Sequence, residues 1–382
     1  MARIVKLLAV IPFAWLLVTA IDAQDQPAEA PEQKPAEQPA DADGPFDTLK
    51  ALREHFEPLR GALATEWEDF KRTAKPDEET FKKLREKEQA LFERERKALR
   101  AYLAEHTDAE DAIEARHGVV MISANLGQWQ DVVAEADAFL AKHKEANADL
   151  TRIVSYSRAD ALLHIEGKEE AAATALEAIV KHYPGETEAN MARELLIVAY
   201  TYLNRIADAK RLVMEMQRMP EVESDEQARA FFDHELAKLN KIGERFPEFV
   251  AYKTDGVKVT RDGITGQPLL VWYWDIAGGT SLPALPGVAK IAKEYEGKLK
   301  IVAISVERNR DSWKQEAEKL AKDHPGIVQL YEGVNGPDRS AASLIDQMPL
   351  PMAVLVTANG TIHRLDVPAF DLARVVKRWL AQ

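Results

Sequence analysis

The sequence contains no cysteine in its 382 residues. Disulfide bonds, thiolate nucleophiles, Cys-ligated zinc and iron–sulfur clusters are therefore all excluded within this chain. The lipid-carrying cysteine of a bacterial lipoprotein is missing as well. Since thiol–disulfide exchange requires a thiolate that attacks sulfur, the chain cannot perform that reaction by itself.

Basic residues are in the minority, with 50 Lys and Arg against 63 Asp and Glu, a formal net charge of -13. Binding to a phosphate backbone requires a concentrated basic face, and adhesion to an anionic membrane does too. We therefore expect neither nucleic acid nor an anionic membrane surface as a partner.

Sequence motifs of catalysis and cofactor binding are also missing. The nine histidines show no H-x-H, H-x-x-x-H or H-E-x-x-H spacing, so the sequence predicts no metal site. There is no G-x-S-x-G, Walker or dinucleotide fingerprint. The sequence thus indicates no cofactor and no catalytic residue.

The N-terminus has the pattern of a secretory signal. Arg3 and Lys6 precede an uninterrupted small-to-apolar run from Leu7 to Ala20, and Ala20 or Ala23 can serve as the cleavage position. We predict a signal peptide over residues 1–23, with a retained N-terminal anchor as the alternative. No second apolar run of spanning length follows. The sequence thus predicts a periplasmic or secreted protein of the cell envelope, without an integral membrane span after signal cleavage.

Residues 24–45 consist mainly of Pro, Ala, Glu and Gln and contain no aromatic or β-branched residue. Such a segment buries too little apolar surface to offset the entropy of ordering, so we expect a disordered tether. A specific binding role for it is the alternative.

Residues 46–241 have helical periodicity throughout. Apolar residues recur every three or four positions on both sides of a break at residues 74–77, at Leu49, Phe56, Leu59, Leu63, Trp67 and Phe70, and then at Phe81, Leu84, Leu91, Leu99 and Leu103. This spacing places them on one face of each helix. We therefore predict an all-α domain.

A weak internal repeat lies within this helical region. Gly127, Gly167 and Asn204 each mark a predicted turn before an Ala-rich helix, with a period close to that of helix-turn-helix repeats. The run after Gly167 resembles the second half of a tetratricopeptide repeat, although Glu169 occupies the usual aromatic position. Such arrays commonly bind peptides or other proteins, so the resemblance implies a peptide or protein partner. A helical bundle that only supports its neighbour is the alternative.

From residue 242 the pattern changes to short apolar runs that alternate with helical stretches. Strands are predicted over residues 269–273, 299–306, 352–357 and 361–365, and helices over 286–295 and 370–380. This order of elements favours an α/β domain.

Several motifs of this last third resemble the TlpA/ResA group of exported bacterial thioredoxin-like proteins. They lie in family order at residues 243–249 (GERFPEF), 266–274 (GQPLLVWYW), 285–286 (LP), 300–306 (KIVAISV), 351–356 (PMAVLV) and 359–360 (NG). The resemblance implies a thioredoxin-like fold over residues 242–382 and a cis-proline at Pro351. It also implies an open strand edge for an extended peptide at Leu350 and Met352.

The sequence departs from that family at the redox site. The family's W-C-x-x-C falls on residues 277–281, so that Gly278 and Ser281 replace the two cysteines, with Gly279 and Thr280 between them. The amides at this helix start could bind a small anion or a carboxylate. Alternatively, Thr280 or Ser281 caps them.

We therefore expect a multidomain protein, an all-α tetratricopeptide-like domain followed by a degenerate α/β thioredoxin-like domain. The function that fits this organisation is non-catalytic binding or scaffolding. The fold suggests redox activity by analogy, but a fold alone does not establish a function. An enzyme of a non-thiol class, with its site at the domain junction or around Gly278–Ser281, is the alternative. A third interpretation is a chain that works with a separate cysteine-bearing protein. The oligomeric state stays open.

Overall fold

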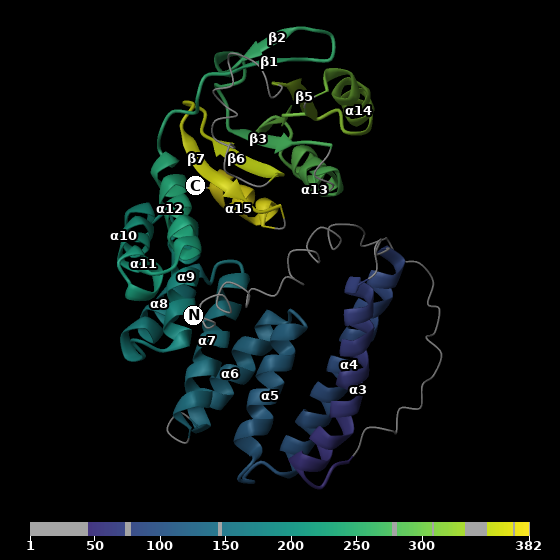
Figure 1. Ribbon diagram of the computed structural model, residues 1–382, viewed down its shortest axis with the longest axis vertical. Coiled ribbons are helices and arrows are strands. Elements are labelled where there is room, and N and C mark those ends of the chain that lie inside the picture. Colours follow the sequence, from purple (N-terminus) through teal and green to yellow (C-terminus); the bar gives the residue numbers. More distant parts are fainter. Residues whose placement is uncertain are drawn as a thin grey trace. The chain divides into compact units, whose positions relative to one another are not determined.

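The structure is a computed structural model, which describes residues 45–72, 78–143, 147–276, 281–307, 309–332, 350–369 and 371–381 (Figure 1). The predicted signal peptide, nearly all of the predicted tether, the break at residues 74–77 and positions 278–280 lie outside the described residues. The contacts divide the chain into two compact units, with the boundary after Asn204. Each unit is considered by itself below.

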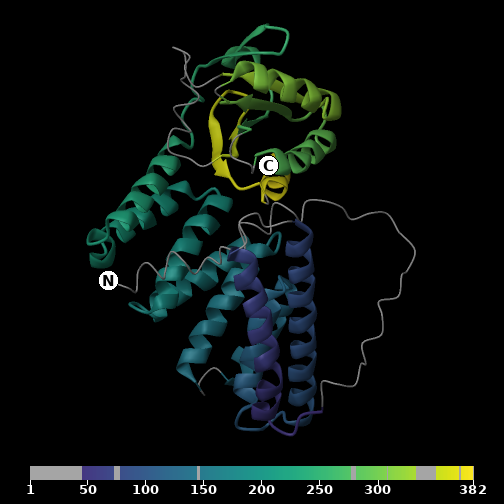
Figure 2. The ribbon, with the colours of Figure 1, turned by 45° about the vertical axis from the view of Figure 1, so that its right-hand side comes forward.

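The N-terminal unit is all helical. Its helices are α3 (Leu49–Arg72), α4 (Glu78–Glu105), α5 (Ala112–Asn125), α6 (Trp129–His143), α7 (Ala148–His164), α8 (Glu169–His182) and α9 (Thr187–Tyr202). Each helix packs against the next, and α7 also contacts both α5 and α9. Figure 2 shows α3 and α4 as two long helices side by side. This stacking of successive helical pairs confirms the tetratricopeptide-like prediction.

Three residues turn the chain between successive helices. Gly127 has φ 67°, Gly167 has φ 80° and Asn204 has φ 60°, all in the left-handed region. Glycine enters that region without steric cost, and asparagine is the residue that follows it most often. The three turn positions predicted from the sequence are therefore the positions where the backbone requires these residues.

Small residues line the contacts between the paired helices. Ala115 of α5, Ala136 of α6, Ala172 of α8 and Ala192 of α9 are all fully buried. Larger side chains fill the space between them, such as Phe139, which packs with Val120, Val132, Val154 and Ala161. Alanine lets helix backbones approach closely, so this unit reaches a dense core with few aromatic side chains.

The C-terminal unit begins with α10 (Ile206–Gln217), α11 (Pro220–Glu223) and α12 (Glu226–Lys241) and continues as one sheet with helices. The remaining elements are β1 (Val250–Tyr252), β2 (Lys258–Thr260), β3 (Leu269–Trp274), α13 (Ser281–Glu294), β4 (Lys300–Ser305), α14 (Arg310–Asp323), β5 (Ile327–Tyr331), β6 (Met352–Val356), β7 (Ile362–Val367) and α15 (Leu372–Leu380). The strand order is β2-β1-β5-β4-β3-β6-β7.

Strands β3, β4 and β5 are parallel, whereas β6 pairs antiparallel with β3 and β7 antiparallel with β6. The crossovers through α13 and α14 move in the same direction along the sheet, so the right-handed rule places both helices on one face. Helix α15 contacts α13 and lies on that face too. A parallel β-α-β part joined to an antiparallel β-β-α part is the arrangement of a thioredoxin-like fold, as the sequence predicts.

The opposite face of the sheet carries a continuous apolar core. Tyr273 and Val271 of β3, Ile304 of β4 and Val354 of β6 pack there against Phe246 and Phe249, together with the other residues of the same cluster. The two phenylalanines belong to the segment that enters the domain, so that segment covers part of the face opposite α13, α14 and α15.

Residues 243–246 also pair with the start of β7. The Gly243 amide donates to the Ile362 carbonyl at 2.8 Å, the Ile362 amide to the Glu244 carbonyl at 2.8 Å, and the Phe246 amide to the Gly360 carbonyl at 2.8 Å. These bonds cover the outer edge of β7 over its first residues.

The sequence patterns did not predict β1, β2 and β5, and they placed the start of α13 too late. Strand β5 is only five residues long with Gln329 in its middle, so its periodicity carries little signal. Helix α13 begins at Ser281 rather than Pro286, which lies inside it. Over the part of the chain that the structure describes, no helix combines the length and apolar character needed to cross a membrane.

Candidate functional site

The degenerate redox position lies at the carboxyl end of the parallel strands. Trp274 of β3 is in register with Ser305 of β4, which is in register with Tyr331 of β5, so the three strands end side by side. Helix α13 starts at Ser281, a few residues after β3 ends. In open α/β sheets ligands bind at the carboxyl ends of the parallel strands, so this edge of the sheet is the candidate site.

The Ser281 hydroxyl is hydrogen-bonded to Asp275. Ser281 Oγ accepts a hydrogen bond from the Asp275 amide at 3.3 Å and donates one to Asp275 Oδ1 at 3.2 Å. The residue is only 1% exposed. Of the two residues predicted to cap the first amides of α13, Ser281 instead bonds to the loop that precedes the helix, and Thr280 lies outside the described residues.

Glu307 ties the loop after β3 to the loop after β4. Its Oε2 accepts a hydrogen bond from the Ile276 amide at 3.2 Å. Its own amide donates to Ser305 Oγ at 3.1 Å, and Ser305 is fully buried. The polar groups at this edge therefore hold the two loops in place.

Tyr273 places a further polar group beneath this edge. The residue is fully buried, and its hydroxyl has no hydrogen-bond partner among the described residues. Burial raises the pKa of the Tyr273 hydroxyl well above its ordinary value, and the Glu332 carboxylate adds to the effect. The hydroxyl thus stays protonated, which makes it an unsuitable general base.

The chemistry available here is limited. A serine hydroxyl becomes a nucleophile when a base such as imidazole takes its proton, but the group that Ser281 contacts is the Asp275 carboxylate. Across the described residues, no three His, Asp or Glu side chains are grouped so that they could hold a metal ion. The described residues of this edge therefore provide no support for the alternative of an enzyme of a non-thiol class.

The predicted edge for an extended peptide, at Leu350 and Met352, lies at the start of β6. Strand β6 lies between β3 and β7, and its register with β7 begins at Ala353, one residue after Met352. Met352 is fully buried and in register with Tyr273, and Leu350 packs against the apolar core. The hairpin predicted from the sequence accounts for one neighbour of β6; the other, β3, is far away in sequence. The Leu350–Pro351 peptide bond is cis.

Asp275 and Glu307 were not singled out from the sequence. The available signal was position, because each polar residue follows directly after a buried strand, where side chains meet at the sheet edge. Of the four degenerate positions, Ser281 is described and lies at this edge, and residues 278–280 lie outside the described part.

No protein-family model and no curated protein matches the sequence. Among solved structures, the chain is similar to a thiol:disulfide interchange protein from Bacteroides sp., with 20% identity and a TM-score of 0.32, covering 37% of this chain and 91% of that one. It is similar to the exposed lipoprotein thioredoxin of Streptococcus pneumoniae, with 16% identity and a TM-score of 0.30, covering 35% and 98%.

A thioredoxin-like protein from Bacteroides caccae matches a longer stretch, with 15% identity, a TM-score of 0.38, and coverage of 66% of this chain and 94% of that one. The strand order of β3 to β7 is what establishes the fold here. The C-terminal unit has a thioredoxin-like fold, and it carries no cysteine.

Proposed function

We propose that the protein is a non-catalytic binding or scaffold protein of the cell envelope. In this proposal a tetratricopeptide-like unit and a redox-inactive thioredoxin-like unit act together to hold a peptide or protein partner. Export is part of the proposal and is supported by the apolar run at residues 7–20 after two basic residues.

The proposal rests on the burial and the hydrogen bonds of the Ser281 side chain. This residue stands where the second redox cysteine of the related family falls, and its hydroxyl is buried and bonded in both directions to Asp275. The hydroxyl donates to a carboxylate and accepts from an amide, so it is held in place rather than prepared for nucleophilic attack. A buried hydroxyl that is hydrogen-bonded in this way supports a structural role.

The partner class is supported by the N-terminal unit. Stacked helical pairs form extended surfaces from many small contributions, and such surfaces commonly bind peptides and proteins. The acidic balance of the chain favours partners with basic or neutral surfaces.

Two experiments test the proposal. The first is reduction of insulin by the full chain with dithiothreitol, with an active thioredoxin as the positive control; we expect no rate above the dithiothreitol blank. The second is capture from native envelope extract, followed by purification of the captured protein and titration against the full chain. Catalytic turnover in the first, or no saturable complex in the second, contradicts the proposal.

A further inference from the structure

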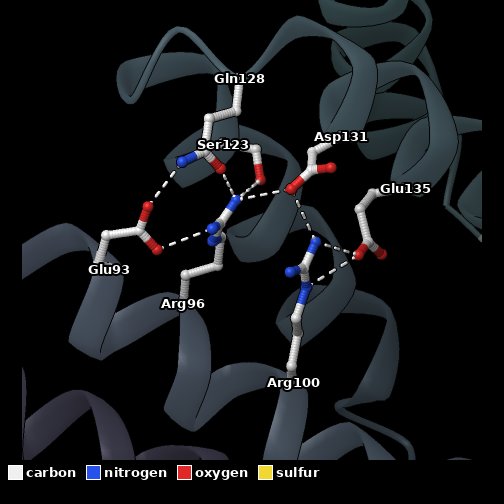
Figure 3. A network of polar contacts seen from close by, with 7 residues as sticks. All are labelled: Glu93, Arg96, Arg100, Ser123, Gln128, Asp131 and Glu135. Atoms are coloured by element: carbon white, nitrogen blue, oxygen red, sulfur yellow. Dashed lines mark hydrogen bonds and ion pairs between the residues drawn. The ribbon is translucent and has the colours of Figure 1, made fainter. Parts of the chain in front are cut away.

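Arg96 is a buried cation at the centre of a polar network in the N-terminal unit (Figure 3). Its side chain is 10% exposed. Nη2 donates to Glu93 Oε2 at 2.7 Å, and Nη1 donates to Asp131 Oδ2 at 2.9 Å and also to Gln128 Oε1. The guanidinium thus joins α4 to the turn between α5 and α6 and to α6 itself.

The network fixes two side chains that reach a neighbouring hollow. Gln128 Nε2 donates to Glu93 Oε1 at 2.6 Å. Both the nitrogen and the oxygen of the Gln128 amide are therefore hydrogen-bonded, and so are both oxygens of the Glu93 carboxylate. Side chains held in this way keep their positions when a ligand arrives, which lowers the entropic cost of binding.

The hollow has a volume of about 430 Å³ and is lined by Glu86, Gln89, Ala90, Glu93, Leu126 and Gln128. Neither lysine nor arginine belongs to this lining. The Glu86 carboxylate and the Gln89 amide make no hydrogen bond or ion pair with a described residue. They are the two polar groups of the lining that remain available to a ligand.

The charge around the hollow is negative. The network and the lining together contain two guanidinium groups, those of Arg96 and Arg100, and four carboxylates, those of Glu86, Glu93, Asp131 and Glu135. Ala90 and Leu126 supply an apolar surface beside these oxygens. A long aliphatic stem with a positive end matches both properties.

We propose that this hollow binds the side chain of a lysine or arginine residue presented by a peptide partner. The methylene groups lie against Ala90 and Leu126, and the cationic end donates to the Glu86 carboxylate and the Gln89 amide oxygen. The volume lies within the range for small-molecule pockets, so the hollow has room for one such side chain and for part of the peptide that carries it. This inference deepens the proposed binding function and rests on it.

The test uses the full chain and three short peptides that are blocked at both ends and differ at one central position, which is lysine, arginine or norleucine. Backbone amide shifts are followed during titration. We expect saturable shifts at Gln89, Ala90 and Leu126 with the two basic peptides, a dissociation constant on the order of 1 mM, and weaker binding of the norleucine peptide.

Glu86→Gln is expected to weaken binding of the basic peptides about tenfold, because it removes the unpaired carboxylate. The matched control is Glu105→Gln, which makes the same charge change in the last residue of the same helix, outside the hollow. Both positions are exposed, so both variants should fold.

Equal affinity of the two variants overturns the inference, and so does equal binding of the norleucine peptide or no saturation at about 10 mM. The proposed function has a separate outcome. If a captured protein partner binds the Glu86→Gln variant as well as the unchanged chain, the binding function stands and the hollow is not its site.

Discussion

Lys238 Nζ lies 3.1 Å from Asp366 Oδ2 and 2.7 Å from Glu235 Oε1. Asp366 is a non-glycine residue with φ 58° in β7. Burial by itself would lower the pKa of Lys238, but the carboxylates of Glu235 and Asp366 outweigh it, and the pKa is raised. The ion pair thus connects α12 to β7 at Asp366, whose left-handed backbone is uncommon outside glycine but accessible to aspartate.

Lys238→Met should destabilise the C-terminal unit by about 2 kcal/mol, because it leaves a mostly buried carboxylate without its cation. Urea denaturation followed by circular dichroism measures the change. Lys241→Met is the control, since its ion pair with Glu244 is about half exposed on both sides and should matter by less than about 0.5 kcal/mol. Equal losses of stability from the two substitutions would show that the Lys238 ion pair stabilises the unit no more than an exposed ion pair does.

Ser281→Cys should give a protein whose single thiol is protected. Because the position is 1% exposed and the chain has no other cysteine, any reaction with a soluble disulfide reagent reports on this site alone. We expect labelling about a hundredfold slower than in urea, and no insulin reduction. Ser224→Cys, at an exposed position, is the control and should react at once. Rapid labelling of the Ser281→Cys protein would mean that the site opens readily.

His363 should make the C-terminal unit less stable in acid. Burial, with a smaller contribution from Arg364, lowers the pKa of His363 to about 4, and its ring stacks on Trp379 at 5.1 Å. An unfolded histidine has a pKa of about 6.5. Between these values the unfolded state binds more protons, so this residue's contribution to stability rises as the pH increases from about 4 to about 6.5.

His363→Phe keeps an aromatic ring against Trp379 and cannot be protonated. The slope of stability against pH in that window should therefore become smaller in the variant, as measured by urea denaturation at several pH values. An unchanged slope would rule out His363 as its source.

Glu194 should act in the opposite direction in the N-terminal unit. Burial raises the pKa of Glu194 to about 7 from its ordinary value of 4.5. Between these values the folded state retains a proton that the unfolded chain releases, so this contribution to stability falls as the pH rises from 4.5 to about 7.

Glu194→Gln mimics the protonated carboxyl, so it should remove this loss of stability and make the unit more stable at pH 7.5 than the unchanged chain. Glu110→Gln, at an exposed position, is the matched control. Denaturation at pH 5 and pH 7.5 provides the comparison, and a Glu194→Gln protein that loses as much stability between these values as the control would refute the assignment.

Arg96→Met should cost about 2 kcal/mol in the N-terminal unit, because the buried guanidinium bonds to Glu93, Gln128 and Asp131 and the substitution removes all of these hydrogen bonds. Arg100 is 42% exposed, and Arg100→Met should cost less than about 1 kcal/mol. Thermal and urea denaturation of the two variants, side by side, decides whether burial sets the difference. Similar losses of stability in the two variants would show that the charge of these residues matters and its burial does not.

The local features of the fold could be predicted from the sequence. Gly127, Gly167 and Asn204 were identified as turns, and each has the positive φ for which such residues are suited. The central strands were found as well, because buried parallel strands are continuous apolar runs such as residues 269–273. These features are decided within a few neighbouring residues.

Features that depend on distant parts of the chain could not be predicted. The pairing of β6 with β3 makes Met352 a core residue, and nothing near residue 352 indicates that pairing. Likewise, Ser281 is a common helix-capping residue, and its bonds to Asp275 require the preceding loop to fold back. The cis bond before Pro351 was implied by the family resemblance, whereas the hydrogen bonds of Ser281 could not be predicted from nearby residues.

The pairing of residues 243–246 with β7 has a consequence for how molecules of this protein meet one another. An unpaired strand edge is a template on which a second chain can add a strand and start an aggregate. At one side of the sheet the segment from Gly243 to Phe246 occupies the start of that template, and at the other side β2 is only three residues long and begins with an exposed lysine, Lys258. Each molecule thus carries its own protection against fibre growth, provided in part by the segment that leads into its domain.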